Sequence, residues 1–161
     1  MAKTWLITGT STGLGRLLTE RLLERGDHVI ATLRRKGSLD DLLDLHGDRL
    51  QILTFDVTDT QTMRDTVSQA FTTFGRIDVV VSNAGYGLFG AAEEASDTQI
   101  ERQIATNLTG SIQFIRAVLP YLREQGVAAS FRYRLRAARL PIQASAFITP
   151  RSGASKGSSN P

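Results

Sequence analysis

The sequence predicts an α/β fold in which a parallel sheet lies between layers of helices. Short apolar runs of strand length alternate with longer segments in which apolar residues recur at helical spacing. The run Val79–Val81 is continuously apolar, as expected of a strand that is covered on both faces. A glycine-rich turn joins the first strand to the first helix. This order of elements is typical of a parallel sheet with helical crossovers.

The turn after the strand Trp5–Thr8 carries three glycines. Gly9 permits a tight turn, Gly13 has no Cβ to hold a diphosphate away from the backbone, and Gly15 allows close packing of helix on strand. The free N–H groups of the first helical turn would then face a negative charge. Although any strand-to-helix turn can use glycine, the position of this one predicts a nucleotide site.

The remaining elements follow in order along the chain. We expect a first helix ending near Gly26, then a strand over 27–32, a helix from Ser38 to about Leu45, a strand at Leu50–Phe55, a helix at Asp59–Phe74, the strand Val79–Val81, and a long helix from Ser96 through Leu122. Ser38, Asp59 and Ser96 are the expected helix caps. Asn107 and Gly110 interrupt the apolar stripe of the long helix, so we expect a kink or distortion there.

The end of the second strand lies where a Rossmann fold selects its dinucleotide, about twenty residues beyond the glycine turn. An acidic residue there would bind a ribose 2′-hydroxyl, but the sequence has Leu33 followed by Arg34, Arg35 and Lys36. Cations at this place would attract a 2′-phosphate, so we predict NADP in preference to NAD. The alternative is that the three cations form a solvated turn.

Three spaced motifs resemble those of the short-chain dehydrogenase/reductase family. TGTSTGLG at 8–15 is similar to the TGxxxGxG cofactor loop, SNAG at 82–85 to NNAG, and NLTG at 107–110 to NxxG. The resemblance covers residues 1–126. It implies an NAD(P)-binding Rossmann unit with strand order 3-2-1-4, and NADP-dependent oxidoreduction of a hydroxyl/carbonyl pair on a small molecule.

The resemblance also assigns site residues. Asp56 and Val57 would touch the adenine, and Asn107 would belong to the catalytic group and hold a water in the proton relay. From the residues alone, Asp56 could serve helix capping, Asn83 could belong to a turn, and Asn107 could be a satisfied structural residue. The full set expected to line the cofactor is Gly9, Ser11, Gly13, Leu14, Arg34, Asp56, Val57, Asn83, Ala84 and Gly85.

The proton-transfer residues of the family have no match in this chain. The family uses a Ser and a YxxxK pair, in which the Lys favours the phenolate of the Tyr for proton exchange with the substrate oxygen. The only tyrosines are Tyr86, Tyr121 and Tyr133, and none is followed by Lys four residues later. We therefore expect little or no turnover.

Residues 127–161 have a different composition from the rest of the chain. Residues 1–126 hold 13 Lys and Arg against 16 Asp and Glu, a net charge of −3, whereas residues 127–161 hold six Lys and Arg and no acid. With three prolines and a Ser/Gly-rich end, this part is expected to be a basic, irregular tail. The alternative is a non-catalytic nucleotide-binding or regulatory protein with a natural basic tail. Salt-sensitive nucleic-acid binding, which we do not expect, would favour this alternative if deletion of residues 127–161 abolished it.

The tail also fits a shifted reading frame. In the shifted frame, each codon consists of the third base of one codon of the given frame and the first two bases of the next. With permitted codons, residues 131–160 can then spell SVSSAGGQIAYPGFSLYHATKWGIEGFIE. That string contains the missing Ser and a YHATK at family spacing. The codon of the missing Ser would overlap those of Arg134 and Leu135. The codon of the Tyr would overlap those of Phe147 and Ile148, and the codon of the Lys would overlap those of Arg151 and Ser152. We hypothesise a single frameshift near Gly126.

Composition narrows the remaining possibilities. The sequence has no cysteine, and neither His28 nor His46 has partners at metal-ligand spacing, so we expect no disulfide and no metal site. No run approaches the ~20 apolar residues of a membrane span, and the N-terminus lacks a signal pattern, which favours the cytoplasm. A parallel sheet cut after its fourth strand leaves an open edge and uncovered helix faces, so we expect self-association.

Resequencing the coding DNA across codons 120 to 165 tests the frameshift. We expect a second open frame that encodes the string above. An intact single frame, with no alternative reading through residues 127–161, would remove the hypothesis.

Overall fold

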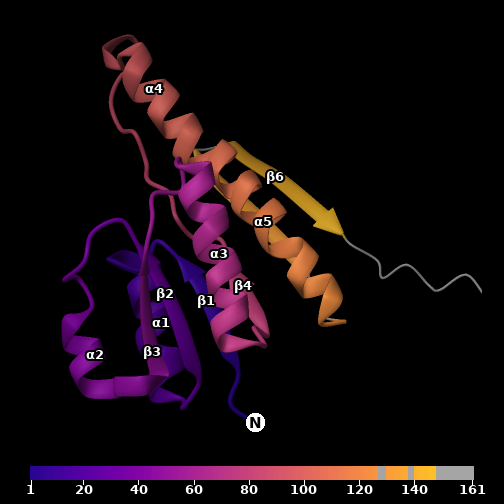
Figure 1. Ribbon diagram of the computed structural model, residues 1–161. Coiled ribbons are helices and arrows are strands. Elements are labelled where there is room, and N and C mark those ends of the chain that lie inside the picture. Colours follow the sequence, from indigo (N-terminus) through magenta and orange to yellow (C-terminus); the bar gives the residue numbers. More distant parts are fainter. Residues whose placement is uncertain (127–129, 138–139, 148–161) are drawn as a thin grey trace, which may run out of the picture.

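The computed structural model describes residues 1–126, 130–137 and 140–147. Its main sheet has four parallel strands in the order β3-β2-β1-β4, as the sequence predicted (Figure 1). The strands are β1 (Thr4–Thr8), β2 (His28–Leu33), β3 (Leu50–Thr54) and β4 (Val79–Val81). The central strand β1 pairs with β2 along its whole length and with β4 from Trp5 to Ile7. All four carboxyl ends therefore lie at one edge of the sheet.

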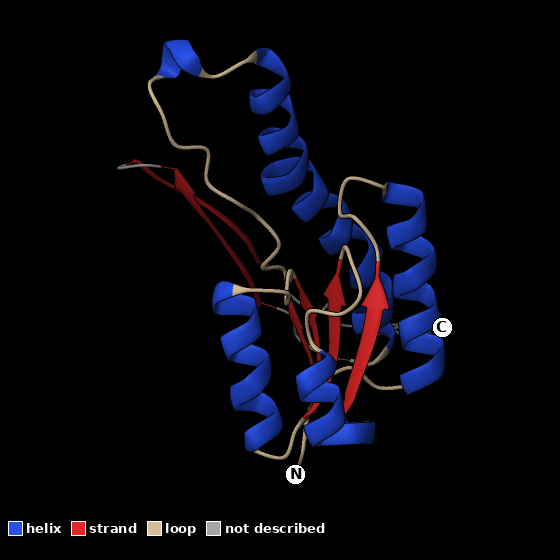
Figure 2. Cartoon of the chain, turned by 90° about the vertical axis from the view of Figure 1, so that its left-hand side faces the viewer, coloured by secondary structure: helices blue, strands red, loops and turns tan. Residues whose placement is uncertain are grey.

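Helices cover both faces of this sheet (Figure 2). They are α1 (Gly13–Glu24), α2 (Asp40–His46), α3 (Thr60–Phe74), α4 (Asp97–Ile104) and α5 (Ser111–Glu124), with 3-10 turns at Gly47–Arg49 and Ala92–Glu94. Within the described residues, no helix has the length and apolar character needed to cross a membrane.

Two apolar cores form because successive strand residues point to opposite faces. Leu6 and Ile30 belong to the core built with the buried side chains of α3 and α5, in which Phe114 is fully buried. Their neighbours Ile7 and Val29 belong to the second core, built with residues of α1 and α2. The nearly continuous apolar sequence of β1 and β2 follows from this coverage on both sides.

Two of the three expected helix caps are confirmed. The Asp59 carboxylate accepts the Thr62 amide at 3.1 Å, and Ser96 forms a capping box with Gln99. The third expectation was wrong, because α2 begins one residue later than predicted, with Leu39 at the N-cap and no capping side chain. The Ser38 carbonyl instead accepts a hydrogen bond from Arg16.

The long helix predicted from Ser96 through Leu122 is distorted in the middle, as expected from Asn107 and Gly110. Between α4 and α5 the chain forms a π-helical segment, η3 (Ala105–Gly110). A Cβ at Gly110 would lie 2.8 Å from the Val57 carbonyl oxygen, so glycine allows this segment to approach the connection after β3. Figure 1 shows α4 projecting beyond the sheet, and α4 has no buried residue.

Part of the predicted irregular tail forms a hairpin. Strands β5 (Ser130–Ala137) and β6 (Leu140–Phe147) pair antiparallel in a two-stranded sheet that is separate from the main one. The sequence signal was present, because Phe131, Tyr133 and Leu135 alternate with arginines at the strand period of two. Residues 127–129, 138–139 and 148–161 of the tail lie outside the described residues.

Two carboxylates fix the start of β1 from either side. Asp27 accepts the Lys3 amide at 2.9 Å and the Trp5 indole N–H at 3.1 Å, and it pairs with Arg25. Burial raises the pKa of the Asp27 carboxyl, but these hydrogen bonds outweigh burial and leave the pKa below its usual value. On the other side, Asp78 accepts the Thr4 amide at 3.0 Å.

We predict that Asp27→Asn lowers the free energy of unfolding by about 1–3 kcal/mol at neutral pH, because a buried, multiply bonded carboxylate is lost. The folded-state pKa of Asp27 is depressed, so its stabilisation is present above the usual carboxyl pKa of about 4 and disappears as the pH falls below it. Urea unfolding followed by the fluorescence of Trp5, the sole tryptophan, measures both effects.

Asp44→Asn is the matched control, since Asp44 lies exposed on α2. It should unfold like the unaltered chain at either pH. A stability gap between Asp27→Asn and the unaltered chain that persists unchanged at pH 3 would contradict the prediction.

Candidate nucleotide-binding site

The glycine turn leaves β1 at the edge where the strands end. Gly9 has φ +70°, a backbone conformation that side chains rarely adopt. A Cβ at Gly9 would also lie 2.7 Å from the Ala84 Cα, so the residue is restricted by space as well as by conformation. The turn therefore packs directly against the connection that follows β4.

Asn83 holds this packing together. Its side-chain amide nitrogen donates to the carbonyls of Thr8 at 3.1 Å and Gly9 at 3.0 Å. In the other direction, the amides of Asn83 and Ala84 both donate to the Thr8 hydroxyl at 3.0 Å. Both N–H bonds of the Asn83 side chain are thus used to shape the turn, and the predicted contact with a cofactor ribose stays a prediction.

Thr10 ties the same turn to β2. The Thr10 hydroxyl donates to the Thr32 carbonyl at 3.1 Å, and the Gly9 amide donates to the same oxygen at 3.0 Å. Thr8, Thr10 and Thr32 are all buried. Sequence analysis did not single out Thr8 or Thr10, although a polar side chain next to a buried strand needs a hydrogen-bond partner.

The helix that follows the turn begins in a way that suits an anion. No side chain caps α1, its first turn has no acidic residue, and its N-cap Thr12 is extended. Gly13 has φ +59°, and a Cβ placed there would meet no atom within 4 Å. Leu14 beside it is 78% exposed. The start of α1 therefore has no side-chain cap and no acidic group to compete with an anion for its free amides.

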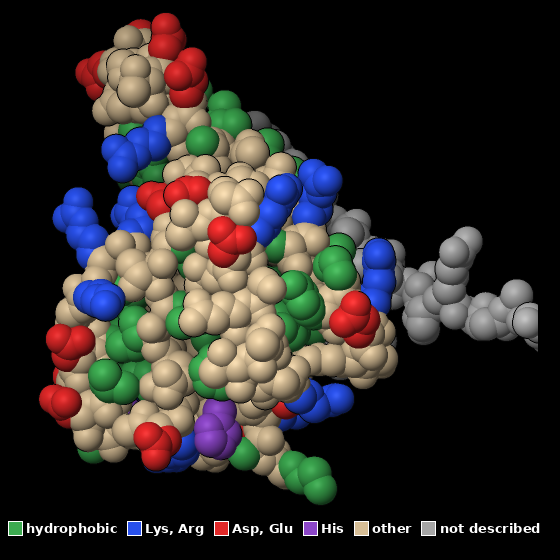
Figure 3. Space-filling model, in the orientation of Figure 1, with side chains coloured by type: hydrophobic (Ala, Val, Ile, Leu, Met, Phe, Trp, Pro, Cys, Tyr) green, Lys and Arg blue, Asp and Glu red, His purple; other side chains and the backbone are tan. Residues whose placement is uncertain are grey.

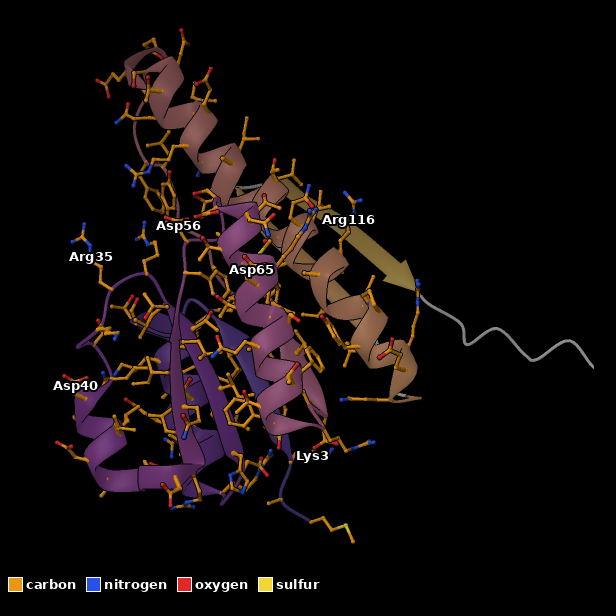
Figure 4. The ribbon with its side chains drawn as sticks, in the orientation of Figure 1. Lys3, Arg35, Asp40, Asp56, Asp65 and Arg116 are labelled. Carbon is orange, nitrogen blue, oxygen red and sulfur yellow. The ribbon has the colours of Figure 1, made fainter. Side chains whose placement is uncertain are left out.

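Basic side chains gather near the same edge. Arg34, Arg35 and Lys36 are exposed and follow directly after β2, and within the described residues no carboxylate forms an ion pair with them. Figure 3 shows Lys and Arg side chains on this part of the surface, where Figure 4 labels Arg35. The three cations are thus available to an external anion.

Asp56 follows β3, next to the basic connection, because Leu33 of β2 pairs with Thr54 of β3. One Asp56 oxygen accepts the Thr58 amide at 2.9 Å and the Thr58 hydroxyl at 2.8 Å, which stabilises the turn that leads into α3. Val57 is buried in the core below. These contacts agree with a structural role, and the contact of Asp56 and Val57 with an adenine stays a prediction.

Asn107 lies in the π-helical segment and holds the connection after β4. Its side chain accepts the Tyr86 amide at 3.0 Å and donates to the Tyr86 carbonyl at 2.7 Å. Gln103 donates to the same carbonyl at 3.3 Å. A Cβ at Gly85 would lie 3.1 Å from the Asn107 amide oxygen. Asn107 therefore contacts the connection after β4 through the backbone of Tyr86. Its role in holding a water stays a prediction.

The structure brings the predicted site residues to one edge of the sheet. Those after β1 and β4 contact one another directly through Gly9, Asn83 and Ala84. Those after β2 and β3 lie on the neighbouring strand ends, where Arg34 is exposed. Ser11, on the turn after β1, is half-buried. Asn107 joins this edge by way of Tyr86.

Comparisons with known proteins point in the same direction. A family model described as short chain dehydrogenase matches residues 3–129. Oxidoreductase BOA17 of Botryotinia fuckeliana is 41% identical over 126 residues, which make up 78% of this chain and 46% of that protein. The NADP-dependent 3-hydroxy acid dehydrogenase YdfG of Shigella flexneri is 36% identical over 121 residues, or 74% of this chain and 49% of that protein.

Solved structures agree with this assignment. A short-chain dehydrogenase from Streptomyces avermitilis superposes with a TM-score of 0.75 at 38% identity, covering 79% of this chain and 47% of that one. The chain spans about half the length of the curated relatives that it matches. With the family model matching most of the chain, with the sheet order 3-2-1-4 and with the glycine turn at its edge, the chain belongs to the short chain dehydrogenase family of oxidoreductases.

Proposed function

We propose that this chain binds NADP(H) and is the cofactor-binding half of an oxidoreductase that acts on a hydroxyl/carbonyl pair. The observation that carries the proposal is the start of α1, where no side chain caps the helix and a Cβ at Gly13 would meet no atom within 4 Å. Backbone N–H groups at a helix start bind phosphate well, because their partial positive charge adds to that of the helix dipole.

The choice of NADP over NAD rests on the connection after β2. Arg34, Arg35 and Lys36 lie there, exposed and without carboxylate partners among the described residues. A 2′-phosphate would pair with such side chains, whereas a 2′-hydroxyl would gain little from them. The relative YdfG, which is named as NADP-dependent, supports the same choice.

In this proposal the residues of the strand ends have separate tasks. Gly9, Ser11, Gly13 and Leu14 lie along the diphosphate, Arg34 binds the 2′-phosphate, and Asp56 and Val57 border the adenine. Asn83, Ala84 and Gly85 border the ribose next to the nicotinamide. When bound, NADPH would supply the hydride for a carbonyl substrate.

The chain as given has no proton donor of the family type. The Ser and the YxxxK pair of the family have no match in this sequence, whereas the hypothesised shifted frame of residues 131–160 can spell both. We infer that the frameshift separates binding from turnover, leaving Asn107 as the remaining member of the catalytic group. The substrate class, a small carbonyl or alcohol, and the cytoplasmic address stay predictions.

NADPH titration of the full chain tests the binding site. We expect saturable binding, seen as a heat or as quenching of the dihydronicotinamide emission. Arg34→Glu should weaken NADPH binding at least about tenfold, since it replaces an attraction to the 2′-phosphate by a repulsion. Binding of NADH should be retained, because a carboxylate at that place suits a 2′-hydroxyl.

Arg123→Glu is the matched control, because it makes the same charge change at an exposed residue in the last turn of α5. It should leave both affinities unaltered. A folded chain that gives no heat, no quenching and no thermal shift with NADPH would overturn the site. Turnover of a carbonyl panel at ordinary family rates would contradict the inferred loss of catalysis.

We also infer that the chain associates with itself. Within the described residues β4 has one strand neighbour, β1, and its other edge is open. Three apolar side chains spaced one helical turn apart, Ile104, Leu108 and Ile112, are 40–50% exposed along η3 and its flanks. Apolar stripes of this kind mark association surfaces.

Sedimentation of the purified chain checks the self-association. We expect concentration-dependent oligomers that Ile112→Lys shifts toward monomer. Leu45→Lys, which alters an exposed apolar residue on α2, should have no such effect. A monomer at all concentrations would contradict the inference.

A further inference from the structure

Arg16 links the start of α1 to the connection that follows β2. It lies one residue beyond Gly15, and its guanidinium extends across to the neighbouring β-to-α connection. Its Nε donates to Glu20 at 2.8 Å, one terminal nitrogen donates to the Ser38 carbonyl, and the other pairs with Asp41. The side chain is only 28% exposed, although it carries a full charge.

The segment that Arg16 holds is the one that carries the three cations. Arg34, Arg35 and Lys36 stand between β2 and the turn at Gly37 and Ser38. The start of this segment is fixed by the sheet, where the Phe55 amide donates to the Leu33 carbonyl at 3.1 Å. Its end is fixed by two contacts, the bond from Arg16 to Ser38 and the burial of Leu39. The cations are therefore held between two anchored ends.

Arg16 also forms ion pairs with two acids, although Asp40, which precedes Asp41 in the first turn of α2, is not one of them. Asp41 is 61% exposed in the first turn of α2, a few residues beyond Lys36, and Glu20 lies on α1. The hydrogen bond from Arg16 holds the pKa of the Asp41 carboxyl below its usual value, so the pair remains ionised at neutral pH. Without Arg16, the carboxylates of Glu20 and Asp41 would lose their ion-pair partner, which would add uncompensated negative charge beside the turn at Ser38.

We propose that Arg16 is a positioning residue for 2′-phosphate selectivity. It anchors the turn at Ser38 to the helix whose first amides face the diphosphate, and it keeps Asp41 away from the basic segment. Selectivity for NADP would then depend on a residue that touches neither the phosphate nor the adenine. This inference rests on the proposed binding of NADP(H) and adds a residue to it.

The ratio of the dissociation constants for NADPH and NADH measures the proposed role. Arg16→Gln should weaken NADPH binding about tenfold while NADH changes by less than about twofold, because only the 2′-phosphate site is disturbed. Arg16→Lys should give an affinity ratio between those of Arg16→Gln and the unaltered chain. Its ammonium can pair with Asp41, but it lacks the two terminal nitrogens with which the guanidinium bonds both Asp41 and the Ser38 carbonyl. Adding Asp41→Asn to Arg16→Gln should also recover part of the affinity ratio.

Arg21→Gln is the control, because Arg21 lies on the same helix, pairs with Glu24 and is 72% exposed. It should leave the ratio unchanged. Circular dichroism and unfolding followed by Trp5 fluorescence establish that each variant is folded, and Arg16→Lys provides a conservative variant should Arg16→Gln not fold.

Two results would overturn the inference while the unaltered chain binds NADPH. One is an unchanged affinity ratio in Arg16→Gln. The other is an equal loss of NADPH and NADH affinity, which is what a purely structural residue would give. If the unaltered chain binds neither dinucleotide, the proposed function itself fails, and that outcome is distinct from both.

Discussion

The hydrogen bonds between Asn83 and the carbonyls of Thr8 and Gly9 are the interaction on which the candidate site depends. Parallel strands leave unpaired backbone groups at their ends, and a buried carbonyl without a partner costs about 1–3 kcal/mol. A single amide side chain satisfies two of these carbonyls. It thereby fixes the turn after β1 against the connection after β4, so the two connections pack as one unit.

This arrangement separates the groups that shape the site from the groups that would meet a ligand. The Asn83 side-chain amide and the Thr10 hydroxyl donate inward to backbone carbonyls, and the Thr8 hydroxyl accepts backbone amides. Thr8 and Thr10 are buried, and Asn83 is half-buried. The start of α1 has no side-chain cap, and the cations after β2 are exposed. A site of this kind is preorganised, because the shape of the turn is set before any ligand arrives and little ordering cost remains to be met on binding.

Whether a feature of the fold or of the candidate site could be predicted from sequence depends on how far apart its interacting residues lie in the chain. Caps such as Asp59 and Ser96 were predicted because their partners lie three residues away. Strand order followed from resemblance and pattern. The start of α2 was not predicted, because the Ser38 carbonyl is bonded by Arg16, which lies 22 residues earlier in the chain. The role of the Asn83 amide likewise depends on residues 74 and 75 positions away, and no local pattern reports such contacts.

The contacts that shape the site all form within residues 1–126. Asn83 closes the turn onto β4, Thr10 closes it onto β2, and Asn107 closes the following connection onto η3 through Tyr86. Each of these bonds joins two described segments and needs no contribution from the hairpin. The backbone geometry of the candidate site is therefore set by residues 1–126 alone. It depends on satisfying backbone groups at the strand ends, which the fold requires in any case.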